Sequence, residues 1–362
     1  MLGAAYGTDI YTDDSSICTA AVHAGLITPE AGGTVTVEIR PGQRSYPSTF
    51  RNNVTSNSWG QWVGSFAFAG PTAVQAMPTR PAPPTVSTAV VSDVDRVPTL
   101  KTATKKHAYA VVIGIEQYRE KLPKADFADR DAKLVGEYLT KVMGYPEENV
   151  IVRTNDKAAK TDLEKYLDEW LRNNVEADGS VFVYYSGHGA PNVKNGEAYL
   201  VPYDGDPSFV ESTGFPLKRL YAALDKLPAR EVTVVLDSCF SGAGGRSVLG
   251  KGLRPMGLSL EQAMQVGGKT MVLAASAGDQ VSSSYEEKGH GLLTYYFLKG
   301  LQGEGDADGD GNIDMAELFT YLKPNVQRTA RKQNNVEQTP QLLTGSELLK
   351  RGSSRLVERA KP

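Results

Sequence analysis

The chain has 362 residues, a length that favours two domains over one. Hydrophobic residues make up 40% and charged residues 22%, which is typical of a globular protein with a sizeable core. The formal net charge of −3 argues against a nucleic-acid partner, and the chain has no run of 18 apolar residues that could span a membrane. Two cysteines, Cys18 and Cys239, exclude a disulfide scaffold.

Four blocks follow one another along the chain. Residues 1–70 are rich in Gly, Ser, Thr and aromatic residues, and "TVTVEIRPG" within this block predicts a half-buried strand that ends at a turn. Residues 71–105 carry repeated prolines and predict an extended linker. Residues 106–345 alternate short apolar runs with amphipathic segments, and residues 346–362 read as a polar tail.

The block 106–345 predicts an α/β domain. Apolar runs such as "HAYAVVIGIEQY", "GSVFVYYSGHG" and "EVTVVLDSC" are typical of buried strands, and the segments between them have helical spacing. In one of these helices Thr161 and Glu164 fit a capping box. Alternating strands and helices favour a parallel sheet covered on both faces, whose sites lie beyond the carboxyl ends of the strands.

A cysteine and a histidine stand at two such strand ends. His188 ends one apolar run and Cys239 ends another, 239 − 188 = 51 residues later. A histidine about 50 residues before a nucleophilic cysteine is the spacing found in caspases. The alternative is a buried structural cysteine and a loop histidine. His290, which precedes a helical segment without an apolar run before it, reads as a structural residue at a helix entry.

Residues 106–345 resemble caspase-fold cysteine peptidases of the metacaspase and bacterial orthocaspase type. "YYSGHG" and "DSCFSG" match the two catalytic segments, "ADRDA" matches the start of an early helix, and "QTPQL" matches the end of the domain. The resemblance implies a caspase-like α/β/α sandwich with a mostly parallel sheet. It also implies a dyad with Cys239 as nucleophile and His188 as general acid/base, with the backbone N–H groups of Gly189 and Cys239 as oxyanion hole.

Asp237 is the clue to specificity. Side chains alternate along a strand, so Asp237 is expected on the side of Cys239, and Ser186 on the side of His188. A carboxylate there either orients a polar network or forms the floor of a pocket for a cationic side chain. The resemblance favours the pocket and implies an S1 site of Asp237, Ser186 and Asp131. We therefore expect cleavage after Arg or Lys, with cleavage after Asp as the alternative.

Three further acidic residues are candidates for the S1 site or for the rim of the cleft. Asp126 and Asp129 lie close to Asp131 in the sequence, and Asp279 is a candidate at the rim of the cleft.

The Gly-rich segment 242–270 comes directly after the nucleophile. Basic residues in a surface loop suit the expected specificity, so this segment is a candidate for self-cleavage. The candidate residues are Arg246, Lys251, Arg254 and Lys269.

The segment "DADGDGNIDMAE", residues 306–317, matches the EF-hand calcium loop without a mismatch. Oxygen ligands at fixed loop positions, with Gly311 at the turn, are the donors that Ca²⁺ requires. The expected ligands are Asp306, Asp308, Asp310, Asn312, Asp314 and Glu317. The alternative is an acidic turn that caps the next helix.

Residues 1–70 resemble an LCCL domain, mainly through "YTDDSSIC" and "GGTVTVEIRPG". The resemblance implies a small β-rich module whose ligand is a lipid or a polysaccharide. Cys18 is its single cysteine, so the disulfides of the family are absent. Trp59, Trp62, Tyr46 and Phe50 are candidates for its core or for an aromatic binding face.

The expected function is a cysteine endopeptidase that acts on protein and peptide substrates. The alternative from another class is a catalytically silent protein that binds through the LCCL-like domain. For localisation, the lack of a signal peptide and the reduced thiol favour the cytoplasm, whereas the LCCL resemblance favours the exterior.

Overall fold

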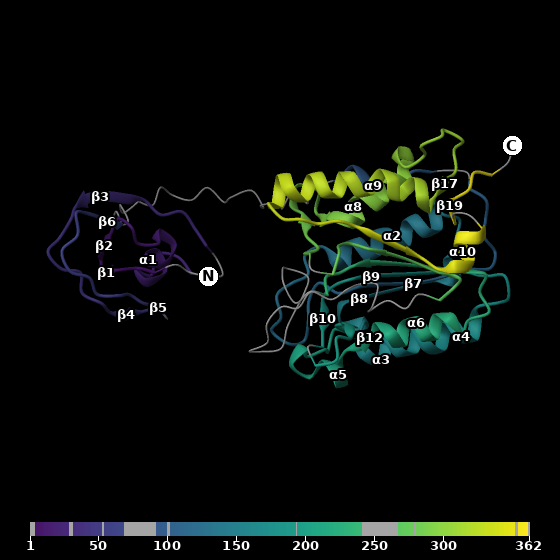
Figure 1. Cartoon of the computed structure of the whole chain (residues 1–362), viewed down its shortest axis with the longest axis horizontal. Helices are drawn as coiled ribbons and strands as arrows, with labels where there is room; N and C mark the ends of the chain where they lie inside the picture. The colour runs from purple at the N-terminus through teal and green to yellow at the C-terminus, as the bar shows by residue number, and fades with distance from the viewer. Residues whose placement is uncertain are drawn as a thin grey trace, which may run out of the picture. The chain divides into compact units, whose positions relative to one another are not determined.

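A computed structural model divides the chain into two units, residues 1–86 and 87–362, which are described separately (Figure 1). The structure describes residues 4–28, 32–52, 54–68, 92–99, 102–192, 194–240, 267–278, 280–351 and 354–360.

The first unit is a small sheet with one helix. Strands β1 (Gly7–Thr8), β2 (Ile10–Thr12), β6 (Gly64–Phe68) and β3 (Val37–Pro41) form the sheet in that order, next to α1 (Ile17–His23) and a hairpin of β4 (Phe50–Arg51) and β5 (Val54–Thr55). Tyr11, Ala20 and Phe66 lie in its core. The predicted strand in 34–42 exists, but it is not half-buried. β3 is an edge strand, and Ile39 on it is 80% exposed.

The second unit is built on a six-stranded sheet. Its order is β18 (Gln341–Thr344), β14 (Thr270–Ala274), β13 (Glu231–Asp237), β9 (Ser180–Ser186), β7 (Ala108–Gly114) and β8 (Val150–Thr154). All neighbouring pairs are parallel except β18, which runs antiparallel to β14. The mostly parallel sheet expected from the sequence is therefore confirmed.

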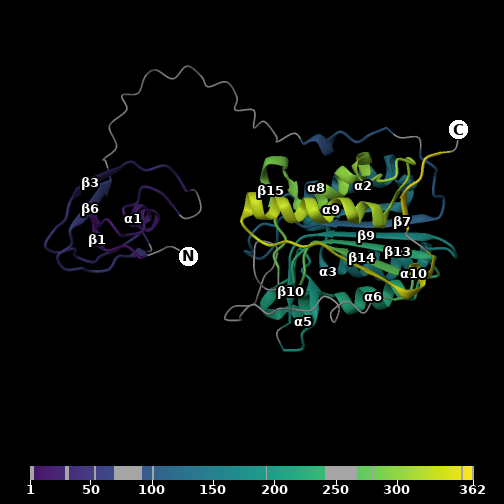
Figure 2. The same ribbon diagram turned by 45° about the horizontal axis from the view of Figure 1, so that its top comes forward.

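Helices cover both faces of this sheet (Figures 1 and 2). One layer contains α2 (Ala128–Lys141), α8 (Leu292–Lys299) with its extension η7 (Gly300–Glu304), and α9 (Met315–Thr329) with η8 (Ala330–Asn334). The other contains α6 (Leu217–Asp225) and the continuous helix α3 (Lys160–Leu163), η4 (Glu164–Trp170) and α4 (Leu171–Asn174). The predicted capping box at Thr161 is wrong, because the helix starts two residues earlier and Asp162 accepts from the backbone N–H of Ala159 at 3.0 Å.

Short elements complete the second unit. The small strands are β10 (Gly189–Pro191), β11 (Ala198–Leu200), β12 (Phe215–Pro216), β15 (Ser284–Tyr285), β16 (His290–Gly291), β17 (Ile313–Asp314) and β19 (Arg355–Val357). The short helices are η1 (Asp93–Asp95), η2 (Glu147–Asn149), η3 (Asn155–Lys157), η5 (Pro207–Phe209), α5 (Val210–Thr213), η6 (Glu286–Lys288) and α10 (Ser346–Arg351).

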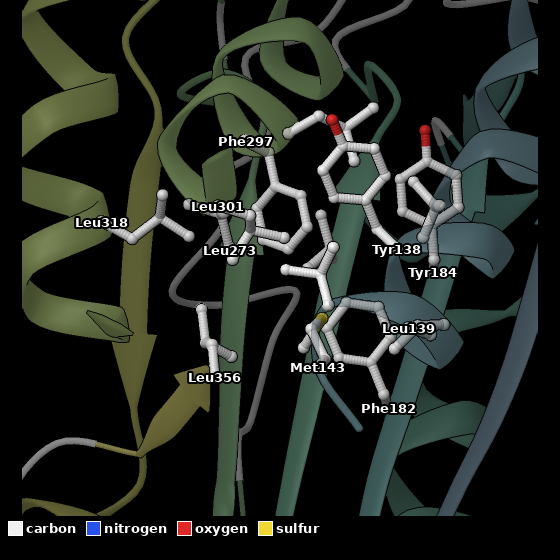
Figure 3. Packing of buried hydrophobic residues seen from close by; sticks show 14 of the residues in the cluster. Tyr138, Leu139, Met143, Phe182, Tyr184, Leu273, Phe297, Leu301, Leu318 and Leu356 are labelled. Carbon is white, nitrogen blue, oxygen red and sulfur yellow. The ribbon is translucent and has the colours of Figure 1, made fainter. Parts of the chain in front are cut away.

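Alternation along the central strands divides the core into two halves. On β9, Val181 and Val183 pack on the side of α6, whereas Phe182 and Tyr184 pack on the side of α2 and α8. Figure 3 shows this second half, where Phe182 and Tyr184 lie among residues of α2 and α8. The same alternation directs the last residues of β9 and β13, and so decides which side chains face α8.

The ends of the second unit differ from the sequence prediction. The sequence places residues 92–99 in the linker 71–105, yet Val94 is fully buried and accepts at its carbonyl from the hydroxyl of Tyr138 at 2.8 Å. The tail 346–362 contains α10 and β19, and Leu356 of β19 is buried in the core. Polar composition hid both segments, because the first contributes Val94 to the core and the second contributes Leu348, Leu356 and Val357, which form no periodic pattern.

Candidate active site

The two central strands bring His188 and Cys239 to one edge of the sheet. β9 and β13 are parallel neighbours whose last residues, Ser186 and Asp237, are register partners. His188 and Cys239 each come two residues later. The segments also touch, because a Cβ placed on Gly189 would lie 2.4 Å from the carbonyl oxygen of Cys239. Any larger residue at position 189 would push the two segments apart.

His188 is fully buried and held by the loop after β7. Its Nε2 lies 2.6 Å from the carbonyl oxygen of Pro123. Tyr118 stacks on its ring at 4.8 Å, and the Tyr118 hydroxyl accepts from the backbone N–H of His188 at 2.6 Å. A carbonyl can only accept, so Nε2 carries the proton and Nδ1 is the nitrogen that can take one up. Pro123 acts through its backbone, which no side-chain pattern in the sequence reveals.

Cys239 is 1% exposed, and its Sγ donates to the carbonyl oxygen of Gln280 at 3.0 Å. This hydrogen bond uses the thiol proton of Cys239. The carbonyl belongs to the segment directly after β14. A substrate that reaches Sγ has to replace this contact.

Asp237, the last residue of β13, is completely buried. It accepts from the Ser282 hydroxyl at 2.8 Å, and from the backbone N–H and hydroxyl of Thr294 at 3.2 and 2.6 Å. Thr294 is in the first turn of α8, where the helix dipole favours a negative charge. The structure therefore accommodates this carboxylate through hydrogen bonds and the end of a helix.

Asp131 lies at the same helix end. It accepts from the backbone N–H of Gly291 at 2.8 Å and lies 2.6 Å from Nδ1 of His290. His290 also lies 3.2 Å from Asp95, so it is a buried structural residue at the entry to α8, as expected. Ser186, Asp237 and Asp131 are all fully buried, and their role in S1 remains a prediction.

A cavity of about 180 Å³ lies between residues that follow Pro123 and residues that follow Gln280 in the sequence. Its lining residues are Lys124, Asp126, Val281, Ser282, Ser283, Ser284, Glu286 and Asn334. Lys124 in its lining directly follows Pro123, whose carbonyl contacts His188. Val281 directly follows Gln280, whose carbonyl contacts Cys239. Two carboxylates against one ammonium leave the lining net negative.

The electrostatic surroundings of this cavity are also negative. Burial raises the pKa of Glu116, and the like charges of Asp129 and Asp126 raise it further, while Lys124 opposes them. Asp129, in the first turn of α2, accepts from the side-chain amide of Asn155 at 3.0 Å and forms an ion pair with Lys133. Of the two alternatives to Asp131, only Asp126 lines the cavity.

The predicted calcium loop has three converging carboxylates. Ligand oxygens of Asp306, Asp308 and Glu317 lie within 4.8 Å of one another. Gly311 has a φ of 83°, as the sharp turn requires. This donor set is made of hard oxygens and fits Ca²⁺.

All six predicted ligand residues also accept hydrogen bonds from the protein, as backbone N–H groups donate to Asp306, Asp308 and Glu317 as well. Asp310 accepts from the backbone N–H of Asn312 at 2.7 Å, and Asn312 accepts from that of Arg359 at 3.1 Å. Asp314 caps α9 by accepting from the backbone N–H of Glu317 at 2.9 Å. The loop thus also performs the capping role that the sequence left as its alternative.

The candidate self-cleavage residues Arg246, Lys251 and Arg254, and the acidic candidate Asp279, lie outside the described residues. Lys269 is described. Its ammonium donates to the carbonyl oxygen of Leu227, immediately before β14 begins.

The aromatic candidates of the first unit divide between core and surface. Tyr46 is 1% exposed, whereas Phe50 is 68% and Trp59 48% exposed. Trp62 lies edge-on to Trp59 and donates to Asp13 at 2.7 Å. Cys18 is an exposed free thiol.

Comparison with known proteins agrees with this geometry. Residues 107–348 match the family model of the caspase domain, and residues 3–66 match that of the LCCL domain. The first match covers most of the chain and includes His188 and Cys239. The chain therefore belongs to the caspase-domain family of cysteine peptidases and carries an LCCL domain at its N-terminal end.

Curated relatives match over short stretches. Human cysteine-rich secretory protein LCCL domain-containing 2 is 49% identical over 55 residues, which are 15% of this chain and 11% of that protein. Human cochlin is 43% identical over 61 residues, or 17% and 11%. The chain thus matches about a tenth of the length of these relatives.

Solved structures match at low identity. A protein of Geobacter sulfurreducens gives a TM-score of 0.46 at 16% identity, covering 66% of this chain and 93% of that one. The Drosophila initiator caspase Dronc gives 0.44 at 10% identity, covering 69% and 84%.

Within the described part of the chain, no helix has the length and apolarity needed to cross a bilayer.

Proposed function

We propose that the protein is an endopeptidase that cleaves polypeptides after Arg or Lys through Cys239 and His188. The observation that carries this proposal is the placement of both residues two positions beyond the paired ends of β9 and β13. The hydrogen bond from Nε2 of His188 to Pro123 supports it further, because it leaves Nδ1 to exchange a proton.

The chemistry is then determined by these groups. Nδ1 accepts the proton of Cys239 as Sγ attacks the scissile carbonyl carbon. The backbone N–H groups of Gly189 and Cys239 donate to the oxyanion of the tetrahedral intermediate. His188 then returns the proton to the leaving amine, and a water molecule hydrolyses the thioester to regenerate the thiol.

Preference for a basic residue is supported by charge. Asp237 lies buried beneath Ser282, and Ser282 lines the cavity that also contains Asp126 and Glu286. A cationic side chain in this cavity gains favourable interactions with both carboxylates, whereas an acidic one is repelled.

Hydrolysis of fluorogenic peptides that end in Arg, Lys, citrulline or Asp tests this proposal, with and without calcium. Cys239→Ala is the control for the nucleophile. We expect turnover of the Arg and Lys peptides only, and none by the control. Turnover of the Asp peptide alone overturns the specificity, and turnover of no peptide favours the binding function of a catalytically silent protein.

We further propose that residues 306–317 bind Ca²⁺ through Asp306, Asp308 and Glu317, whose oxygens already converge. Titration calorimetry of the wild type should show one site that Glu317→Gln removes. Heat from calcium that persists in this variant contradicts the assignment.

Self-processing within 242–270 is proposed on the basis of its basic residues. Incubation of purified protein should produce two fragments, and Cys239→Ala should remain intact. Identical uncut bands contradict it.

For the LCCL domain, we propose a lipid or polysaccharide ligand at the exposed Phe50 and Trp59, to be tested by binding of Trp59→Ala to liposomes and glycans.

A further inference from the structure

The "QTPQL" segment places a fully buried amide beside the active-site wall. The Oε1 atom of Gln338 accepts from the backbone N–H of Ser283 at 3.0 Å and from its hydroxyl at 2.7 Å. Its Nε2 donates to the carbonyl oxygen of Ala275 at 3.2 Å. One side chain therefore joins the end of β14 to the residue that precedes β15.

The next residue holds the middle of the same segment. The backbone N–H of Thr339 donates to the side-chain Oε1 of Gln280 at 2.6 Å. Residues 338 and 339 together contact Ala275, Gln280 and Ser283, all between β14 and β15.

The held segment delivers two groups to the site. The backbone carbonyl of Gln280 accepts from Sγ of Cys239, and the hydroxyl of Ser282 donates to Asp237. The position of the segment thus determines how deeply the nucleophile is covered and how the floor of the pocket is hydrogen-bonded.

We infer that Gln338, assisted by Thr339, is a positioning residue for the nucleophile and the specificity pocket; this inference rests on the proposed peptidase function. The amide is needed because it accepts on one oxygen and donates from its nitrogen, so it connects two backbone groups of opposite polarity. Methionine has a similar shape, but it has no donor and its sulfur is only a weak acceptor.

The test uses the full chain with Cys18→Ser, so that Cys239 is the single thiol. Gln338→Met is compared with Gln302→Met. Gln302 is the control, because it is also a hydrogen-bonded amide: its Nε2 donates to the Asp93 and Arg96 carbonyls and the Tyr138 hydroxyl, all in another part of the fold. Three quantities are measured for each: the thermal midpoint, kcat/KM on an Arg peptide, and the rate of Cys239 alkylation by iodoacetamide.

We expect Gln338→Met to lower kcat/KM about tenfold and to raise the alkylation rate several-fold, because the released segment uncovers Sγ. Gln302→Met should leave both rates within twofold while lowering the thermal midpoint similarly. Equal effects of the two variants, or an unchanged alkylation rate in Gln338→Met, overturn the inference.

Ser283→Ala keeps the inference testable if Gln338→Met does not fold, because it removes only the shorter hydrogen bond to Oε1. Ser283→Ala should shift kcat/KM and the alkylation rate in the same directions by a smaller factor. Unchanged rates count against the positioning role of Gln338. Alkylation needs no substrate. A wild type that turns over no peptide therefore refutes the proposed function, while the alkylation comparison still decides the role of Gln338.

Discussion

At the scale of single residues, the active site is defined as much by backbone carbonyls as by side chains. Pro123 fixes the histidine ring and Gln280 holds the resting thiol, each through its carbonyl oxygen. Both carbonyls come from loops at the ends of parallel strands. Substituting the side chain of Pro123 or Gln280 therefore leaves its carbonyl contact in place. Mutations that test these contacts should change the side chains that position the two backbone segments.

Glu286 offers a direct test of how the cavity selects charge. It is exposed and lines the cavity, whereas its neighbour Glu287 is exposed but is not one of the lining residues. We expect Glu286→Gln to lower kcat/KM for an Arg peptide about three- to fivefold, the size of a solvent-screened charge interaction. A citrulline peptide, which is not expected to be turned over, is tested as an inhibitor of Arg-peptide cleavage. Its inhibition constant should not change, since its side chain is neutral. Glu287→Gln is the control, and an equal loss in both variants contradicts a specific role for Glu286.

The sequence located His188, Cys239 and Asp237 because each depends on local pattern, namely a buried strand and the polar residues directly after it. It could not locate Pro123, Gln280 or Gln338, since their contacts come from segments 41 to 65 residues away in the chain. A carbonyl contact requires no particular residue type. The only available signal was the "QTPQL" motif, which indicated the family without indicating a role.

At the scale of elements, the C-terminal strand β19 completes the layer around α9. It pairs with β17, which belongs to the predicted calcium loop, and inserts Leu356 into the core shown in Figure 3. We expect Leu356→Ala to lower the free energy of unfolding by about 2–5 kcal/mol, as for other leucines removed from a packed core. Urea unfolding measures this. Ile39→Ala, at an 80% exposed position, is the control and should change stability little.

Ion pairs connect the short helix η1 to Lys288 of η6 and Lys299 of α8. Burial opposes ionisation of Asp93, but hydrogen bonds from Lys288 and Lys299 outweigh it and hold the pKa of this carboxyl well below its usual range. A depressed pKa contributes stability above the unfolded pKa of about 4, and this contribution is lost as the pH falls towards the folded pKa.

Asp93→Asn should therefore destabilise the protein at pH 7 and at pH 5 by about 1 kcal/mol, a discounted value because the carboxylate is 39% exposed. The difference from wild type should shrink below pH 4. Urea midpoints at pH 7, 5 and 3 measure it. A difference that is constant across the three pH values argues that packing, rather than ionisation, is responsible.

The sequence predicted the elements of the sheet well, because β7, β9 and β13 are continuous apolar runs. It assigned η1 and β19 to a linker and a tail, since Val94 alone, or Leu356 next to Val357, gives no periodic pattern. Such segments acquire their structure from the surface they cover. Composition therefore predicts the layers of this fold better than the short segments that attach to them.

At the scale of the whole molecule, two units have separate cores. The core of residues 1–86 contains Tyr11 and Phe66. The proposed dyad, the residues that line the cavity, and Gln338 with Thr339 all belong to residues 87–362. The LCCL domain is thus not required to build the catalytic groups.

This division predicts that residues 87–362 fold and act without the LCCL domain. The fragment should retain kcat/KM on short peptides within twofold of the full chain, because the groups that contact a short substrate are all present. It should also unfold cooperatively, since η1 remains packed at Val94. Peptide kinetics and circular dichroism of the fragment and of the full chain provide the comparison. A fragment that folds but loses activity would show that the first unit contributes to the site itself.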